Sequence, residues 1–127
     1  MNHKDLEVWK LAMEFITDIY SITKKFPKEE FYGLTNQIRR CAISIPSNIA
    51  EGSARQSDKE LIQFLYIALG SVSELETQLI IARNLNYINE IENYIKQLIS
   101  IRSLTLGLIK YIKNKNKSLH PSPFTLH

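Results

Sequence analysis

Arginine and lysine side chains offer this chain its clearest chemistry, which is contact with the phosphate oxygens of a nucleic acid. Guanidinium groups bind phosphate through paired N–H donors, and lysines bind it as point charges. Arg39 and Arg40 are adjacent in a helical pattern, so their side chains diverge by about 100°. We expect one of them to join an internal network and the other to face solvent or a lumen. The candidate phosphate-contacting residues are Arg39, Arg40, Arg55, Lys59, Arg102, Lys110, Lys113, Lys115 and Lys117.

A purely structural role is the alternative for the arginine pair. In that arrangement Arg39 or Arg40 pairs with Glu74 or Glu76 across a helix interface, and Asn48 caps backbone groups. Removing one member of such a buried pair would cost about 3–5 kcal/mol, because the other charge would be stranded. The sequence leaves open which of the two arginines is buried.

Patterns typical of catalytic or metal sites do not occur in the sequence. His3, His120 and His127 all lie in the predicted termini, and the Glu-x-x-His spacing of metal sites in helical bundles is missing. Cys41 is the one cysteine and falls on an apolar stripe, where an inert buried thiol is expected. We therefore predict a protein that is not an enzyme and that uses no cofactor and no metal.

The positive charge is concentrated in the second half of the chain. Residues 1–60 hold nine basic and nine acidic residues, whereas residues 61–127 hold seven basic and four acidic ones, giving the formal net charge of +3. Four of those seven are the lysines at 110, 113, 115 and 117. Cations also favour a helix C-terminus for electrostatic reasons, so this cluster permits a nucleic-acid surface but does not require one.

Apolar and charged residues are distributed as in a globular cytoplasmic protein. The hydrophobic content of 44% is sufficient for a packed core in a chain of 127 residues. No run of about 18 apolar residues occurs, which predicts no membrane span. The first residues, MNHKDLEVW, lack the apolar core of a signal peptide, so we expect a cytoplasmic location.

The hydrophobic periodicity predicts four helices joined by short links. They cover about residues 6–25, with Asp5 as the N-cap, 34–50, 58–83 and 89–113. Ser57 and Glu60 form a capping-box pattern at the start of the third helix. Pro46 lies inside the second, where its ring should bend the helix. We predict an all-α, antiparallel up-down four-helix bundle over residues 1–113, with helix two kinked near Pro46 and a flexible C-terminal tail at 114–127.

The first predicted helix is apolar on two stripes, although one stripe would suffice for a single packed face. One stripe is Leu6, Trp9, Met13, Ile16 and Tyr20, and the other is Val8, Ala12, Phe15, Ile19 and Ile22. Two neighbours must cover this helix, one in the same chain and one in a second subunit. The predicted oligomer-interface residues are Val8, Trp9, Ala12, Phe15 and Ile19.

The third and fourth helices carry the seams expected to form the core. The third has an unbroken heptad seam, and the fourth has a cation, Arg102, on its apolar seam. A buried cation requires a carboxylate partner or a wet cavity. The heptad residues are Leu61, Leu65, Ala68, Val72, Leu75, Leu79 and Ala82.

Three segments carry a resemblance to a known family. QIRR at 37–40, SIPSNIAEG at 44–52 and GSVSELE at 70–76 resemble the four-helix bundle proteins encoded in intervening sequences of bacterial 23S ribosomal RNA genes, and the likeness covers about residues 4–112. The resemblance implies a homopentamer closed as a ring. Related accessory proteins of diversity-generating retroelements form similar barrels that bind nucleic acid and a reverse transcriptase.

Two functions remain open on these grounds. The first is a non-catalytic, oligomeric nucleic-acid-binding protein, with RNA as the expected ligand and a ring that adds up the positive charge of its subunits. The second is a scaffold for protein–protein interactions, in which the basic residues serve only solubility and helix ends.

Overall fold

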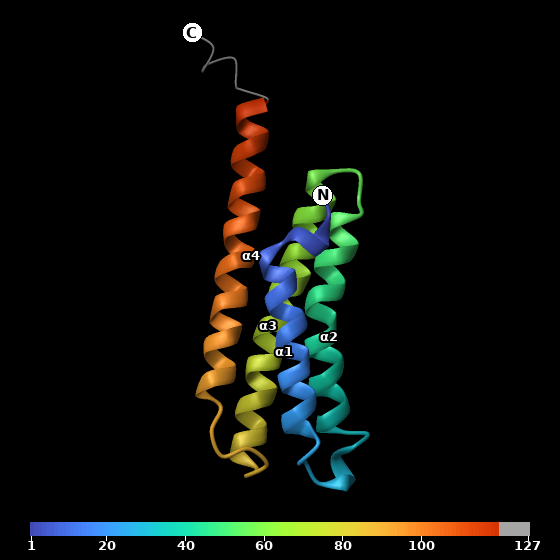
Figure 1. Ribbon diagram of the computed structural model, residues 1–127, viewed down its shortest axis with the longest axis vertical. Coiled ribbons are helices and arrows are strands. Elements are labelled where there is room, and N and C mark those ends of the chain that lie inside the picture. Colours follow the sequence, from blue (N-terminus) through green and yellow to red (C-terminus); the bar gives the residue numbers. More distant parts are fainter. Residues whose placement is uncertain (120–127) are drawn as a thin grey trace.

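A computed structural model describes residues 1–119 of the chain, with side chains through Asn116. These residues form an all-α structure without a strand. Its elements are η1 (His3–Asp5), α1 (Glu7–Thr23), η2 (Lys28–Glu30), α2 (Leu34–Ser53), α3 (Asp58–Asn84) and α4 (Glu92–Leu119). The α-helices alternate in direction, and each packs against its two neighbours around a closed bundle (Figure 1). The predicted all-α four-helix bundle is confirmed.

The helix ends show where local sequence signals are strong. At the start of α3, the backbone N–H of Glu60 donates to Ser57 Oγ at 3.2 Å, and that hydroxyl donates to Glu60 Oε1 at 2.9 Å. Ser57 is thus the predicted N-cap, but the Glu60 carboxylate accepts from the Ser57 hydroxyl and not from the Ser57 backbone N–H, as a capping box would have it. The predicted cap at Asp5 is wrong, because Asp5 belongs to η1 and Leu6 precedes α1.

Two helices are longer than their patterns predict. The second, α2, continues through the buried Pro46 to Ser53 as one helix. The fourth, α4, begins at Glu92 and ends at Leu119, so residues 114–119 are helical where a flexible tail was expected. The rest of that predicted tail, 120–127, lies outside the described residues.

The core is built around the predicted heptad seam of α3. All seven seam residues are buried, and they meet one stripe of α1 and the apolar face of α2. The burial of this α1 stripe contradicts the predicted oligomer interface. Val8, Ala12, Phe15 and Ile19 are 2% exposed or less within their own chain, so they cannot form a contact with a second subunit. Trp9 lies on the other stripe and is half-buried.

Gly52 of α2 lies in close contact with α3. A Cβ atom added to this glycine would lie 2.7 Å from Phe64 Cβ and 3.1 Å from Leu61 Cδ1. Any side chain at this position would therefore push the two helices apart. Gly70, in the middle of α3, is the opposite case, because a Cβ atom there would meet nothing within 4 Å.

A hydrogen bond and an aromatic contact connect the two loops at the lower end of the bundle. Tyr87, in the α3–α4 loop, donates its hydroxyl to Glu30 Oε2 at 2.9 Å, and its ring lies 5.4 Å from that of the buried Phe26. The Glu30 carboxylate raises the pKa of Tyr87 above its ordinary value, because it stabilises the protonated phenol. The α1–α2 connection is thus anchored to the opposite pair of helices.

Within residues 1–119, the length and the apolar composition of one helix, α3, would allow it to cross a membrane. Its heptad seam accounts for much of this apolar character, and that seam is buried inside the bundle.

Candidate nucleic-acid interface

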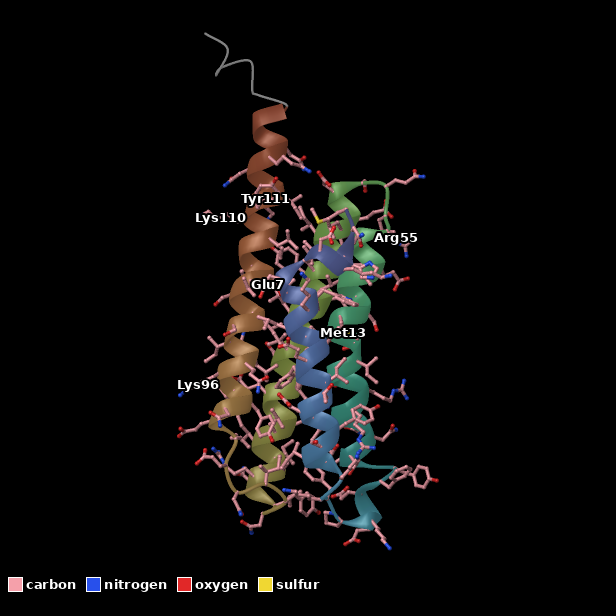
Figure 2. All side chains as sticks on the ribbon, viewed as in Figure 1. Glu7, Met13, Arg55, Lys96, Lys110 and Tyr111 are labelled. Atoms are coloured by element: carbon pink, nitrogen blue, oxygen red, sulfur yellow. The ribbon has the colours of Figure 1, made fainter. Side chains whose placement is uncertain are left out.

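The predicted phosphate-contacting residues do not form one patch. Arg39 and Arg40 lie near the start of α2, at the lower end of the bundle, whereas Arg55 and Lys59 lie at its upper end. Even at the upper end the cations diverge, since Lys110 and Arg55 point to opposite edges of the molecule (Figure 2). The lower and upper groups must be considered separately.

Arg39 is held by α1 and not by a carboxylate. Its Nε donates to Thr23 Oγ1 at 2.8 Å, its Nη2 donates to the carbonyl of Tyr20 at 3.4 Å, and its guanidinium carbon lies 4.4 Å from the centre of the Tyr20 ring. The predicted pairing of Arg39 or Arg40 with Glu74 or Glu76 is therefore wrong for the chain through Asn116, where neither arginine forms a salt bridge.

The side chains of the two arginines differ in burial, as expected from their different directions on the helix. Arg39 is half-buried against α1, and Arg40 is exposed. Only two of the five guanidinium N–H groups of Arg39 are used by the bonds to α1. The remaining donors and the whole of Arg40 are available to a ligand.

Two adjoining hollows, of about 310 and 300 Å³, lie at the α1–α2 connection; Arg39 borders both, and Arg40 borders the second. Four of the lining residues are cations, and no carboxylate lines either hollow within the described part of the chain. Phe31 lines both hollows and Tyr32 lines the second, and these residues are 54% and 89% exposed. We call this surface the α1–α2 corner; its residues are Tyr20, Lys24, Lys28, Phe31, Tyr32, Asn36, Arg39 and Arg40.

The aromatic half of this corner is not among the predicted site residues. Its residues belong to the segment PKEEFYG at 27–33, which links the first two predicted helices. A signal was present, because Phe31 and Tyr32 are two large aromatic residues in a polar turn that no helical stripe explains. Their proximity to Arg39 depends on how α1 and α2 are paired, which the sequence does not show directly.

At the upper end, carboxylates compensate much of the positive charge. Lys115 lies 3.7 Å from Asp58, and Arg55 lies 3.2 Å from Glu51 and stacks over the Phe64 ring. The other cations here are exposed: Lys59, Lys110, and Lys113, whose Nζ donates to the Tyr66 hydroxyl at 3.3 Å. The side chain of Lys117 is outside the described residues. Two of the cations at this end are thus paired with carboxylates, whereas Lys59, Lys110 and Lys113 form no salt bridge with the described side chains.

Arg102 pairs with a carboxylate, as its position on an apolar seam required. Its Nη2 lies 3.7 Å from Glu76 Oε1, and both side chains are about one-third exposed. The ion pair explains how α4 accommodates a cation on its seam, and it makes Arg102 a weak candidate for phosphate contact.

The Cys41 thiol is unsuited to nucleophilic chemistry. Burial, aided by the negative charge of Glu74, raises the pKa of this thiol to about 12. Its Sγ lies 3.1 Å from the Ser71 carbonyl, to which it donates across the α2–α3 interface. In the described part of the chain, no three His, Cys, Asp or Glu side chains are grouped as a metal ion would need.

A separate apolar groove of about 410 Å³ lies between α1 and α2. Met13 and Ile43, one from each helix, are 42% and 40% exposed there, and Figure 2 shows Met13 on the side of α1 that borders α2. We call it the α1–α2 groove; it is lined by His3, Trp9, Met13, Ile16, Ile43, Pro46, Ser47 and Ala50. It includes Trp9, the one predicted interface residue that remains at the surface.

The chain is similar to known proteins over most of its length. The family model described as "23S rRNA-intervening sequence protein" matches residues 4–107. A crystal structure of a protein with unknown function from the S23 ribosomal protein family, from Bacteroides thetaiotaomicron VPI-5482, is 29% identical. The TM-score of the match is 0.74, and the match covers 81% of the present chain and 95% of the Bacteroides chain. No curated protein matches the chain.

Proposed function

Because the chain belongs to the family of 23S rRNA-intervening sequence proteins, we propose that it is a non-catalytic cytoplasmic protein that binds RNA through the α1–α2 corner. The observation that supports this proposal most directly is the charge of the corner. Lys24, Lys28, Arg39 and Arg40 line adjoining hollows without a carboxylate among the described lining residues. Such a surface attracts polyanions, because binding releases the counterions that surround their phosphates.

Arg40 provides the sharpest test, because it is exposed and forms no salt bridge with the side chains described through Asn116. We expect Arg40→Glu to weaken the binding of a structured RNA by about tenfold, or roughly 1.4 kcal/mol. Removal of its phosphate contact should also make the plot of log affinity against log salt concentration shallower by about 0.7–0.9. Fluorescence anisotropy with a labelled RNA hairpin between 50 and 200 mM salt measures both quantities.

Two variants with the same change of charge serve as controls. Lys96→Glu alters α4 far from the corner, and Lys110→Glu alters the upper end (Figure 2). Both should bind RNA nearly as the parent does. If Lys110→Glu has the larger effect, the interface is at the upper end of the bundle. If the parent protein fails to bind RNA at low salt, or binds it independently of salt, the proposal is wrong.

We also propose that the protein is a homo-oligomer whose subunits meet at the α1–α2 groove. The exposed apolar side chains of Met13 and Ile43 support this assignment, since such surface is costly to leave in water. A ring of subunits would also multiply the formal charge of +3 on each chain. The scaffold function considered above would use the same groove for a different protein.

Introducing a charge into this groove should prevent assembly. We expect Met13→Glu to convert the oligomer to a monomer in native mass spectrometry, because the carboxylate would lose its hydration in the interface. Ile99→Glu, at a site on α4 that is 49% exposed, should leave the assembly intact. A parent protein that is monomeric at micromolar concentration would contradict the proposed oligomer and would leave the groove to a different partner.

A further inference from the structure

Phe31 and Tyr32 are an unusual feature of the α1–α2 corner, because two large aromatic rings project into solvent from one turn. They contact each other edge to face, with ring centres 5.0 Å apart and an angle of 86° between the planes. Tyr32 is 89% exposed, so both faces of its ring are largely open. An open aromatic face next to cations is the arrangement on which proteins stack unpaired nucleobases.

The turn that carries these rings is well anchored. The N–H of Phe31 donates to the Lys28 carbonyl at 3.1 Å, and the N–H of Gly33 donates to the Glu30 carbonyl at 2.9 Å. Glu30 in turn accepts hydrogen bonds from the Tyr87 hydroxyl at 2.9 Å and from the N–H of Leu34 at 3.2 Å. These hydrogen bonds fix the backbone that carries the two rings, which lowers the entropic cost of binding a ligand there.

Arg39 and Arg40 supply the cations of this arrangement. The hydrogen bonds of Arg39 to Thr23 and Tyr20 fix the plane of its guanidinium before any ligand arrives. Tyr32, Asn36 and both arginines border the same hollow. A strand crossing the corner would thus have ring faces for its bases and guanidinium groups for its phosphates.

We infer that the corner selects single-stranded nucleic acid, with bases stacked on Tyr32 and Phe31 and phosphates bound by Arg39 and Arg40. This inference rests on the proposed function and makes it more specific. A duplex keeps its base faces inside its own stack, so it can offer the corner only its phosphates. An unpaired strand or loop offers both groups.

The experiment compares three labelled ligands that share one sequence of about 12 nucleotides without internal pairing. They are the single-stranded RNA, the duplex of that RNA with its complement, and the single-stranded DNA. We expect the single-stranded RNA to bind about tenfold more tightly than the duplex. Tyr32→Ala should weaken single-strand binding by about 5- to 150-fold, the range for one stacked base, and leave duplex binding nearly unchanged. Tyr32→Phe keeps the ring and should bind single strands as the parent does.

The outcomes separate this inference from the proposed function. Equal affinity for single strand and duplex, with no effect of Tyr32→Ala, would overturn the stacking inference while RNA binding itself stood. Failure of every nucleic acid to bind would overturn both. Displacement of the single strand by polyglutamate as readily as by polyuridylate would show that only charge is recognised, which also overturns the inference. Equal binding of the DNA strand would support stacking and identify the ligand as single strands of either sugar.

Discussion

Replacing Phe15 with alanine should lower the free energy of unfolding by about 3–5 kcal/mol. Phe15 is 1% exposed and is among the largest fully buried side chains of the described core, and its ring lies edge-on to that of Tyr94 on α4, with ring centres 6.4 Å apart. The alanine variant loses the transfer free energy of the ring and leaves a cavity where α1 meets α4. Urea denaturation followed by circular dichroism measures the loss as a lower midpoint with an unchanged slope.

Ile99→Ala is the matched control, because Ile99 lies on α4 with 49% of its surface exposed. We expect a loss of less than about 0.5 kcal/mol there. The comparison tests which stripe of α1 faces the core. If Phe15→Ala destabilised the protein no more than Ile99→Ala does, Phe15 would lie on the surface and α1 would be rotated relative to the described structure.

Substitution of Gly52 by alanine should destabilise the protein by about 1–3 kcal/mol. Alanine is intrinsically the better helix former by about 1 kcal/mol, so helix propensity alone predicts the opposite sign. The steric effect prevails because the added methyl group would lie 2.7 Å from Phe64 Cβ, an atom fixed directly to the α3 backbone. The helices can relieve this contact only by moving apart, which loosens the α2–α3 interface.

Gly70→Ala isolates the propensity effect, because a methyl group there meets nothing within 4 Å. We expect this variant to be more stable than the parent by about 0.5–1 kcal/mol. Opposite signs for the two substitutions, measured as thermal midpoints at one protein concentration, are the expected result. Stabilisation by both would mean that α2 and α3 do not approach closely at Gly52.

The helices were predictable because their signals are local. The heptad seam of α3 and its N-cap at Ser57 depend only on residue spacing along one helix, and both are confirmed. The extra length of α4 was not predictable in the same way. Residues 114–118 are polar, but Lys115 pairs with Asp58 at the start of α3, a contact that exists only once the two helices lie side by side.

The orientation of α1 shows where periodicity stops being informative. Its two apolar stripes have the same spacing, so the period identifies them both without indicating which one faces the core. The structure buries the stripe with Phe15 and leaves Met13, from the other stripe, at the α1–α2 groove. Four of the five predicted interface residues therefore lie on the buried stripe.

The candidate site was only half predictable, since its cations come from a helix and its aromatic rings come from a turn. Arg39 and Arg40 were identified from their type and spacing. Their expected carboxylate partners were wrong because Glu76 pairs with Arg102, while Arg39 is satisfied by the neutral hydroxyl of Thr23 and the Tyr20 ring. Neutral partners of this kind leave no charge pattern in a sequence.

The alternating helix directions leave both described chain ends far from the α1–α2 corner. α1 begins and α4 ends at the upper end of the bundle, whereas the corner lies at the lower end, about the 30 Å length of α2 away (Figure 1). A fluorophore or tether attached at the start of η1 would therefore begin at the far end of the bundle from the corner. Immobilisation through that end suits single-molecule or surface-based measurements, because it leaves open the face on which a strand would lie.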